Sequence, residues 1–324
     1  MVKAIRMEEI GGPEVLRLVD VEPPKPGPGE VLIDQKAIGL NFIDIYMRTG
    51  LYPVKLPFTP GSEGAGVVME VGDGVDNFKP GDRVAYCAGN GGAYAEQRVV
   101  DAGKVVHVPD NISFEQAAAM ILKGMTAWFL LRRTYRVQPG DTILYHAAAG
   151  GVGLLFGQWA NHLGATVIGT VGSAEKMELA RSHGFHHVIN YREENFVERV
   201  REITGGEMCN AVYDSVGKDT FPGSLDCLRP LGMFVSFGQS SGVVPPFGIN
   251  LLQQKGSLFA TRPVLFHYIA RREELDTAAR ELFDVVGQGV VKVVINQQYK
   301  LADAGKAQDD LAQRRTSGTT ILIP

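Results

Sequence analysis

Residues 146–153, which read HAAAGGVG, form a glycine-rich turn between a predicted strand, TILYH, and a predicted helix that begins near Gly151. Glycines at such a corner allow a tight turn and a close approach of the backbone to a pyrophosphate, and the helix N-terminus offers N–H groups to the anion. The pattern alone is weakly diagnostic, because such corners also occur without a ligand. We expect His146, at the end of the strand, to be a hydrogen-bonded core group rather than a base. The strand–turn–helix context predicts a dinucleotide site, whose candidate residues are Gly150, Gly151, Val152 and Gly153.

The end of the next predicted strand, about 20 residues further on, indicates which dinucleotide binds. An Asp or Glu at that point would bind a ribose 2′-hydroxyl, but residues 170–173 read TVGS. The nearby polar and basic side chains suit a 2′-phosphate instead, so the sequence favours NADP(H) over NAD(H). Lys176 has the alternative of being a solvated lysine on a helix surface. The candidate residues for this contact are Gly172, Ser173, Lys176, Tyr191 and Arg192.

Two regions of different composition divide the chain. Ten of the 17 prolines lie in residues 1–110, where short β-rich runs are separated by Gly, Pro and Asp turns, which predicts an irregular and mostly antiparallel β domain. After residue 125, apolar runs of strand length alternate with segments of helical period. This alternation predicts βαβ units and a doubly wound parallel sheet. The alternation of strands and helices ends after about residue 265, and we expect the remaining C-terminal segment to belong to the first domain.

Composition restricts the possible functions. A chain of 324 residues with 45% hydrophobic and 21% charged residues is typical of a folded protein with two domains. The net charge of -4 provides no positive field for a phosphate polymer, so nucleic acid is an unexpected partner. Cys87, Cys209 and Cys227 are far apart, which argues against a disulfide framework and indicates a reducing compartment. Neither a signal peptide nor a long apolar stretch is present, so we expect a cytoplasmic protein without a membrane partner.

Four segments carry a resemblance to a known family: GLNFIDIYMRTGLYP, HAAAGGVG, NYREE and VYDSVG. Together they resemble the zinc-free quinone oxidoreductase branch of the medium-chain dehydrogenase/reductase superfamily, which includes zeta-crystallin, and they are most similar to its bacterial NADPH:quinone reductases. The resemblance covers essentially the whole chain. It implies a GroES-like catalytic domain formed by residues 1–125 and 266–324, with a Rossmann NADP-binding domain, residues 126–265, inserted between these two parts.

The resemblance also bears on metal binding. Zinc alcohol dehydrogenases, which the chain resembles too, place a Cys in the first domain and a Gly-His-Glu motif later, and catalytic zinc needs such ligands. Here Asn41 stands at the Cys position and Ser62 at the His position, and the four-cysteine cluster of a structural zinc site is missing. We therefore expect no metal of either kind. All three cysteines are expected to be small core residues.

In the reduction of a quinone by NADPH the cofactor supplies the hydride. The protein must supply a binding site beside the nicotinamide that excludes water, and hydrogen-bond donors for the negative charge that develops on the quinone oxygen. The resemblance implies Asn41, Tyr46, Tyr52 and Arg262 for these roles. Asp44 follows Asn41 by three residues in a predicted helix, which would place the two side chains on one face and make Asp44 an orienting group. The two tyrosines have the alternative of anchoring an amphipathic segment, and Arg262 has that of a salt bridge.

Further cofactor contacts are implied by the resemblance alone. Asn41 and Arg262 are expected to contact the cofactor as well as the acceptor. Phe129 stands where close relatives carry a tyrosine, so that packing against the cofactor can persist without the hydrogen bond of the phenol. The remaining candidates for cofactor contacts are Thr126, Phe129, Ser215, Val216, Phe237, Gly238, Ser240 and Arg314.

The resemblance predicts an NADPH:quinone oxidoreductase that needs neither zinc nor flavin and transfers reducing equivalents to soluble quinones. An alternative is the reduction of an activated double bond in an alkenal or alkenone, because both reactions deliver hydride to a conjugated carbonyl system and pocket shape separates them. Another alternative is a non-enzymatic protein that binds NADPH and RNA, against which the acidic net charge counts. The family also suggests a homodimer, for which the β-like segment at residues 256–262 would be a suitable sheet edge.

Overall fold

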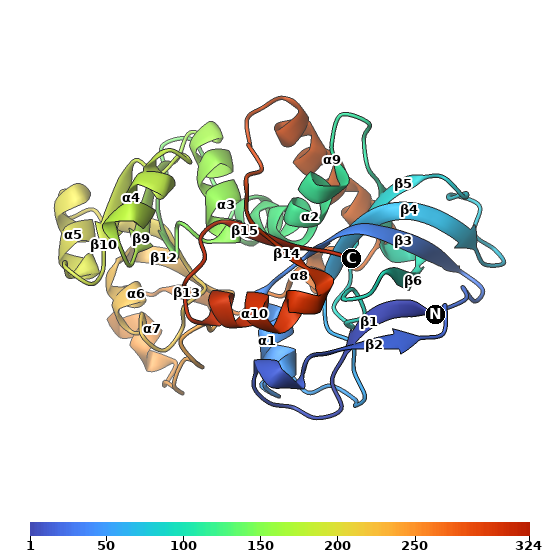
Figure 1. Ribbon diagram of the computed structural model, residues 1–324. Coiled ribbons are helices and arrows are strands. Elements are labelled where there is room, and N and C mark those ends of the chain that lie inside the picture. The colour runs from blue at the N-terminus through green and yellow to red at the C-terminus, as the bar shows by residue number, and fades with distance from the viewer. The chain divides into compact units, whose positions relative to one another are not determined.

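The computed structural model describes the whole chain, residues 1–324, which forms two compact units (Figure 1). The first, which we call the split unit, consists of Met1–Met125, Ile269–Gly287 and Val293–Pro324. The second, the inserted unit, consists of Thr126–Tyr268 and Gln288–Lys292. The expected boundary after residue 265 lies just before the end of the main inserted segment, and the return of Gln288–Lys292 to that unit was not expected.

A mostly antiparallel sheet forms the centre of the split unit. Its strand order is β14-β15-β3-β4-β5-β7, and β6 also pairs with β3. The C-terminal strand β15 runs antiparallel to β3 with Ile321 opposite Gly39, so both ends of the chain contribute to one sheet. The strands of the split unit are β1 (Val2–Arg6), β2 (Arg17–Val21), β3 (Glu30–Gly39), β4 (Glu63–Val71), β5 (Arg83–Cys87), β6 (Gln97–Asp101), β7 (Val105–His107), β14 (Ile295–Lys300) and β15 (Thr319–Ile323).

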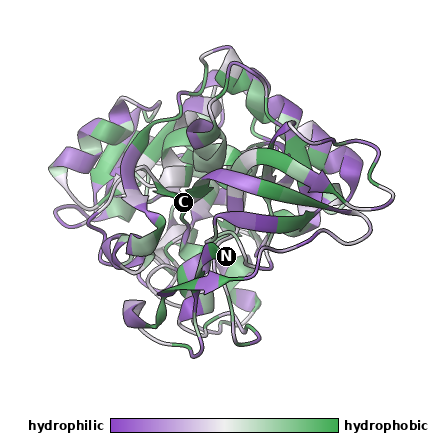
Figure 2. Ribbon diagram, turned by 45° about the vertical axis from the view of Figure 1, so that its right-hand side comes forward, coloured by the Kyte–Doolittle hydropathy of each residue, from purple (hydrophilic) through white to green (hydrophobic).

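Hydrophilic and hydrophobic residues alternate along several helices of the protein, as expected where one face of a helix is buried (Figure 2). Four helices belong wholly or mainly to the split unit. They are α1 (Phe42–Arg48), α2 (Phe114–Phe129), whose last turn belongs to the inserted unit, α9 (Arg272–Gly287) and α10 (Ala304–Ala312), with 3₁₀ turns at Pro13–Val15, Ala102–Lys104 and Leu301–Asp303. Side chains from the first strands and from α10 share one core. Its members include Ile33, Ile38, Val68, Val84, Tyr94, Ala304, Ala307 and Leu322.

A six-stranded parallel sheet forms the centre of the inserted unit and confirms the predicted doubly wound architecture. Its order is β10-β9-β8-β11-β12-β13. From β8 the chain first adds strands on one side and then, from β11 onward, on the other, so the sheet has a topological switch point between β8 and β11. Open α/β sheets bind their ligands outside the carboxyl ends of the strands at such a point. The strands are β8 (Thr142–His146), β9 (Thr166–Val171), β10 (His187–Asn190), β11 (Cys209–Asp214), β12 (Leu228–Ser236) and β13 (Phe259–Thr261).

The helices of the inserted unit connect these strands. They are α3 (Gly151–His162), α4 (Ala174–Arg181), α5 (Phe196–Ile203), α6 (Gly223–Asp226), α7 (Asn250–Gln254) and α8 (Leu265–Tyr268), and a π-helical turn, Leu130–Thr134, follows α2. One core cluster of this unit contains Leu144, Ile168, Ile189, Val200, Val212, Leu225 and Phe234. In neither unit does a helix combine the length and the hydrophobicity that a membrane span requires.

Candidate active site

The predicted glycine turn lies at the switch point of the parallel sheet, between β8 and α3. Ala147 has a positive φ of 63°, and Gly150 is the N-cap of α3 without a side-chain cap. The first N–H groups of a helix have no acceptor within the helix, so this uncapped end can bind an anion. A Cβ atom at Gly153 would collide with the carbonyl oxygens of the turn, which shows why a glycine is required where the helix packs against the strand. The candidates Gly151 and Val152 lie in the same first turn.

Polar side chains gather at the end of the neighbouring strand β9. Ser173 caps α4 by accepting a hydrogen bond from the Lys176 N–H at 3.4 Å. A Cβ atom at Gly172 would lie 2.6 Å from the Tyr191 hydroxyl and 3.5 Å from Arg192 Nε, so both side chains lie directly beside this glycine. No carboxylate terminates β9, since the sequence continues Val-Gly-Ser after Thr170. This group of hydroxyl, phenol and guanidinium donors suits the 2′-phosphate that the sequence predicted.

A buried polar network, which the sequence did not reveal, supports the switch point; we call it the Asp214 network. Asp214 Oδ1 accepts hydrogen bonds from the N–H groups of Val216 and Gly217 at 2.8 and 2.9 Å. Its Oδ2 accepts from the hydroxyls of Thr220 and Ser224, both at 2.7 Å. An Asp that follows a buried strand and precedes a glycine-containing turn is the available signal for this arrangement. The carboxylate fixes the turn that carries the candidates Ser215 and Val216.

His146 belongs to the same network and is fully buried, as the sequence predicted for a hydrogen-bonded core histidine. Its Nδ1 lies 2.9 Å from Thr170 Oγ1, and its Nε2 lies 3.1 Å from Ser224 Oγ. Because the Ser224 hydroxyl donates to Asp214, the serine oxygen is left to accept from Nε2–H. Burial lowers the pKa of His146, and the Asp214 charge offsets this only in part. His146 is therefore a neutral positioning group in this network.

The carboxyl end of β12 lies beside the Asp214 turn. The N–H of Phe237 donates to the carbonyl of Asp214 at 2.9 Å, and the N–H of Ser240 donates to the carbonyl of Ser215 at 3.1 Å. A Cβ atom at Gly238 would lie 2.6 Å from the Ser215 carbonyl oxygen, so only glycine allows this approach. The structure thus brings together the candidates on these two turns, which are Ser215, Val216, Phe237, Gly238 and Ser240.

Three further candidates of the inserted unit have different surroundings. Arg262 follows β13, is exposed, and donates from Nη1 to the carbonyl of Ser236 at 3.0 Å, which draws its guanidinium toward the end of β12. Thr126 and Phe129 are buried in the last turns of α2. The Phe129 ring stacks on Tyr268 with centroids 4.8 Å apart, so a protein ring already packs against it.

A second buried network joins the end of β3, helix α1, the start of β4 and helix α2 in the split unit; we call it the Glu63 network. Glu63 Oε1 accepts hydrogen bonds from Asn41 Nδ2 at 2.7 Å and from Lys123 Nζ at 2.5 Å. Its Oε2 accepts from the N–H of Leu122 at 2.7 Å. Glu63 and Lys123 have side chains only 0% and 5% exposed, so this is a fully buried ion pair. Sequence reasoning missed both residues as functional candidates, because they are far apart in the chain.

Asp44 adds a second carboxylate to the Glu63 network. It accepts hydrogen bonds from the Ser62 hydroxyl at 2.9 Å, from the Asn41 N–H at 3.0 Å and from the Tyr94 hydroxyl at 3.1 Å. Burial, helped by the nearby Glu63 charge, outweighs these three hydrogen bonds and raises the pKa of Asp44 to about 6. Helix α1 begins at Phe42, so Asn41 is its N-cap and Asp44 its third residue, and the two residues form a capping box. The expected contact between them is therefore made at the helix cap, where Asp44 holds the backbone N–H of Asn41.

The residues at the expected zinc positions do not fit a metal ion. The Asn41 amide and the Lys123 ammonium both donate to Glu63, while the Ser62 hydroxyl donates to Asp44. Donors and a fixed cation thus surround the carboxylates that a metal would need, and no group of three or more His, Cys, Asp or Glu side chains could hold an ion. Cys87, Cys209 and Cys227 are free and buried, and burial raises the pKa of each thiol, as expected for core residues.

The tyrosine candidates follow Asn41 in the split unit. The rings of Tyr46 and Tyr52 meet edge to face with centroids 5.3 Å apart, and the Tyr52 N–H donates to the Tyr46 carbonyl at 3.0 Å. Both residues are partly exposed. The structure therefore brings the two phenol rings together at the C-terminal end of α1. This arrangement agrees with either alternative, namely that the tyrosines anchor their segment or that their hydroxyls donate hydrogen bonds to the acceptor.

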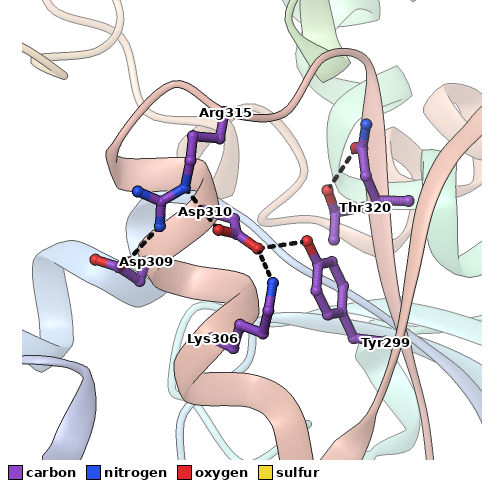
Figure 3. Close-up of polar contacts among 7 residues, drawn as sticks. Tyr299, Lys306, Asp309, Asp310, Arg315 and Thr320 are labelled. Carbon is purple, nitrogen blue, oxygen red and sulfur yellow. Dashed lines mark hydrogen bonds and ion pairs between the residues drawn. The ribbon is translucent and has the colours of Figure 1, made fainter.

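Arg314 lies in the turn after α10, where it has a positive φ of 60°. An ion cluster holds this turn (Figure 3). Asp310 accepts hydrogen bonds from Arg315 Nε at 2.7 Å, from Lys306 Nζ at 2.6 Å and from the Tyr299 hydroxyl at 2.8 Å. The cluster fixes the backbone on both sides of Arg314, which is itself exposed.

The chain matches two families of known proteins. Residues 27–110 match the alcohol dehydrogenase GroES-like domain family, and residues 151–284 match the zinc-binding dehydrogenase family. The chain is 53% identical to a quinone oxidoreductase of Pseudomonas aeruginosa over the full length of both chains, and 45% identical to a 2-haloacrylate reductase of Burkholderia sp over 100% of this chain and 99% of the relative. The crystal structure of Escherichia coli quinone oxidoreductase complexed with NADPH is 51% identical, with a TM-score of 0.98 over 99% of this chain and 100% of that one.

Proposed function

The chain belongs to the quinone oxidoreductase branch of the medium-chain dehydrogenase/reductase superfamily, and from this premise we propose that it is an NADPH:quinone oxidoreductase that needs neither zinc nor flavin. The observation that carries the proposal is that strand β9 ends without an Asp or Glu residue. At this strand end Ser173 caps helix α4, and the side chains of Tyr191 and Arg192 lie beside Gly172. The neighbouring strand β8 leads to the N-terminus of α3, which has no side-chain cap and lies at the switch point of the sheet. This is the arrangement that a dinucleotide with a 2′-phosphate requires.

NADPH, when bound, supplies the hydride from its nicotinamide ring. The N-terminus of α3 binds the pyrophosphate, with Gly150, Gly151, Val152 and Gly153 providing N–H groups and room. The side chains of Ser173, Lys176, Tyr191 and Arg192 bind the 2′-phosphate. The two turns at the ends of β11 and β12 line the path of the cofactor, while Thr126 and Phe129 pack against it. Arg314, held by the Asp310 cluster, adds a positive charge.

The acceptor needs donors for the negative charge that develops on its carbonyl oxygens. Tyr46, Tyr52 and Arg262 supply hydroxyl and guanidinium donors in this proposal. Asn41 contacts the cofactor or the acceptor with its carboxamide, and Asp44 orients Asn41 through the N-cap hydrogen bond of α1. No side chain is required as a general acid, because the hydride comes from the cofactor and the hydroquinone anion that forms takes its proton from water.

An acceptor panel tests this function directly. Purified protein is mixed with NADPH or NADH and with 1,4-benzoquinone, 9,10-phenanthrenequinone or an α,β-unsaturated aldehyde, and the absorbance of the reduced nicotinamide is followed. The proposal predicts fast oxidation of NADPH with the quinones and slow oxidation of NADH. Tight NADPH binding without turnover on any acceptor would contradict it and would return attention to a non-enzymatic role, including RNA binding.

A second candidate function is the reduction of an activated carbon–carbon double bond. The observation that favours it is the 45% identity to a 2-haloacrylate reductase over essentially the full length of both chains. The same panel separates the two, because a higher kcat/KM with the unsaturated aldehyde or with 2-chloroacrylate than with the quinones would move the chain to this class.

We also propose that the protein is a cytoplasmic homodimer paired through the inserted unit. Strand β13 is an edge of the parallel sheet, and unpaired edges invite a second strand. Exposed apolar side chains gather in the segments around this edge, namely Leu231, Val243, Phe247, Ile249, Phe259 and Val264. Phe259→Asp should shift the mass measured by light scattering from dimer to monomer. A wild-type monomer at micromolar concentration would contradict this proposal.

A further inference from the structure

The buried carboxylate of Glu63 is surrounded by a built site at the start of β4. Three donors converge on its two oxygens, namely Asn41 Nδ2, Lys123 Nζ and the N–H of Leu122. Gly39 on the adjacent strand β3 leaves room for this carboxylate, because a Cβ atom at that residue would collide with it. Residues of β3, β4 and α2 thus together accommodate the Glu63 carboxylate.

A gain in stability does not explain this arrangement. Taking two charges out of water costs several kcal/mol per ion, and apolar residues of similar volume often replace a buried ion pair without loss. The pair of Glu63 and Lys123 is almost completely buried, so this cost applies in full. A buried pair is better explained when it specifies the geometry of a neighbour, and the neighbour here is the side chain of Asn41.

A carboxamide has an oxygen end and a nitrogen end of nearly equal shape, so packing alone does not fix which end points outward. A carboxylate that faces an ammonium can only accept hydrogen bonds. Glu63 therefore requires the nitrogen end of Asn41 to point toward it. The carbonyl oxygen then lies on the side of the first turn of α1, where it belongs to a capping box with the N–H of Asp44, and its second lone pair remains for another donor. The N–H of Asn41 is held in addition by Asp44 at 3.0 Å, so both the backbone and the side chain are fixed.

We propose that Glu63, held by Lys123, is a positioning residue that presents the carbonyl oxygen of Asn41 as an acceptor for a hydroxyl or amide donor of the reduced nicotinamide cofactor. The inference rests on the proposed function, because it assigns Asn41 to the cofactor. It deepens that function by making the Glu63–Lys123 pair the source of the Asn41 orientation. Lys123 acts as a fixed internal cation here, and its contribution is to keep an acceptor beside the amide of Asn41.

A double-mutant cycle between Asn41 and the ion pair tests the inference. The variant Glu63→Gln/Lys123→Met replaces both charges by neutral groups of similar size, which avoids an unpaired buried charge. Gln at residue 63 can turn either end toward Asn41, so the packing is kept and the orientation is lost. We expect kcat/KM with NADPH to fall about tenfold, chiefly through a higher KM for NADPH, and to fall similarly in Asn41→Ala. In the Asn41→Ala background the Glu63→Gln/Lys123→Met change should alter kcat/KM by less than about twofold, because its target is absent.

Leu282→Ala serves as the control for loss of stability. Leu282 packs against Gly124, next to Lys123, and does not take part in the Glu63 network. It should lower the melting temperature while leaving the KM for NADPH unchanged, and its effect should add to that of Asn41→Ala. Full additivity of Glu63→Gln/Lys123→Met with Asn41→Ala, or an unchanged KM in the ion-pair variant, would overturn the inference. Absence of NADPH binding in the wild-type protein, measured by nicotinamide fluorescence, would instead overturn the proposed function.

Discussion

The two units differ in how they neutralise a buried carboxylate. In the Asp214 network, one carboxylate accepts from two backbone N–H groups and two hydroxyls, and no cation is present. In the Glu63 network, two carboxylates lie together, and one lysine pairs with only one of them. The second carboxylate, Asp44, relies on three hydrogen bonds that do not offset its burial, and its pKa is therefore raised to about 6.

This difference gives the two units opposite responses to pH. Asp44 takes up a proton in the folded protein at a pH where the unfolded chain is still ionised, so the split unit gains stability as the pH falls toward 4. Burial lowers the pKa of His146, so the inserted unit loses stability as the pH falls below the ordinary histidine range. The Asp214 network thus loses stability in acid, whereas the Glu63 network loses stability as the pH rises through about 6.

Removal of Asp214 should have the largest effect. Asp214→Ala leaves two N–H groups and two hydroxyls without their acceptor in a buried site, and we expect the free energy of unfolding to fall by about 3–5 kcal/mol. Urea denaturation measures this change. The exposed Asp219→Ala, in the same loop, is the control and should change stability by less than about 0.5 kcal/mol. A loss below about 1 kcal/mol in Asp214→Ala would show that the neutral donors do not depend on the carboxylate.

The pH dependence of the split unit should be the next largest effect. A rise of the Asp44 pKa from 3.8 to about 6 corresponds to about 3 kcal/mol, at about 1.4 kcal/mol per unit. Because the folded state holds the proton more tightly, the stability of the wild-type protein relative to Asp44→Asn should fall by about this amount as the pH rises from about 4 to about 7. Urea denaturation across this range measures the difference.

Asp310→Asn provides a control of opposite sign in the same unit. Hydrogen bonds from Lys306, Tyr299 and Arg315 lower the pKa of Asp310, so the stability it contributes is present above its ordinary pKa and lost as the pH falls (Figure 3). The wild-type advantage over Asp310→Asn should therefore grow as the pH rises toward about 4 and stay nearly constant from about 4 to about 7. A parallel response of the two variants would mean that burial does not dominate at Asp44.

Lys176→Ala should have a moderate effect confined to the cofactor. Removing one cation beside the 2′-phosphate should weaken NADPH binding about tenfold, while the Kd for NADH, which lacks this phosphate, stays within about twofold. Fluorescence titration with both nucleotides measures the two constants. Arg181→Ala, in the last turn of the same helix, should leave both unchanged. Equal losses for NADPH and NADH in Lys176→Ala would make Lys176 a structural residue.

Tyr52→Phe should have the smallest effect. Loss of one hydroxyl donor for the acceptor should lower kcat with 1,4-benzoquinone by about three- to fivefold, which is below about 1 kcal/mol, and leave the Kd for NADPH unchanged. Stopped-flow and binding measurements separate the two. Tyr299→Phe removes a hydroxyl from the Asp310 cluster and should keep the wild-type kcat. An unchanged kcat in Tyr52→Phe would leave this residue as an anchor of its segment.

The features that could be predicted from the sequence are those formed by residues close together in the chain. The parallel sheet, the glycine turn and the acid-free end of β9 all follow from residues that are neighbours in the chain. The pair of Glu63 and Lys123 does not, because β4 and α2 meet only in the folded unit and either residue alone resembles an ordinary charge. The role of Asp214 could not be predicted for a related reason. Its donors Thr220 and Ser224 lie six and ten residues further along the chain, and only the folded turn brings their hydroxyls to the carboxylate. The role of Asn41 as a helix cap likewise depended on where α1 begins.

The most direct test of the central claim is the rate of NADPH oxidation by 1,4-benzoquinone in protein treated with a chelator. Mass spectrometry of the metals and the visible spectrum establish that the preparation contains neither zinc nor flavin. Because Asn41, Ser62 and Lys123 surround Glu63 and Asp44 with donors, we expect the same kcat before and after chelation and no gain on adding zinc. A rate that falls with the zinc content and recovers when zinc is restored would contradict it.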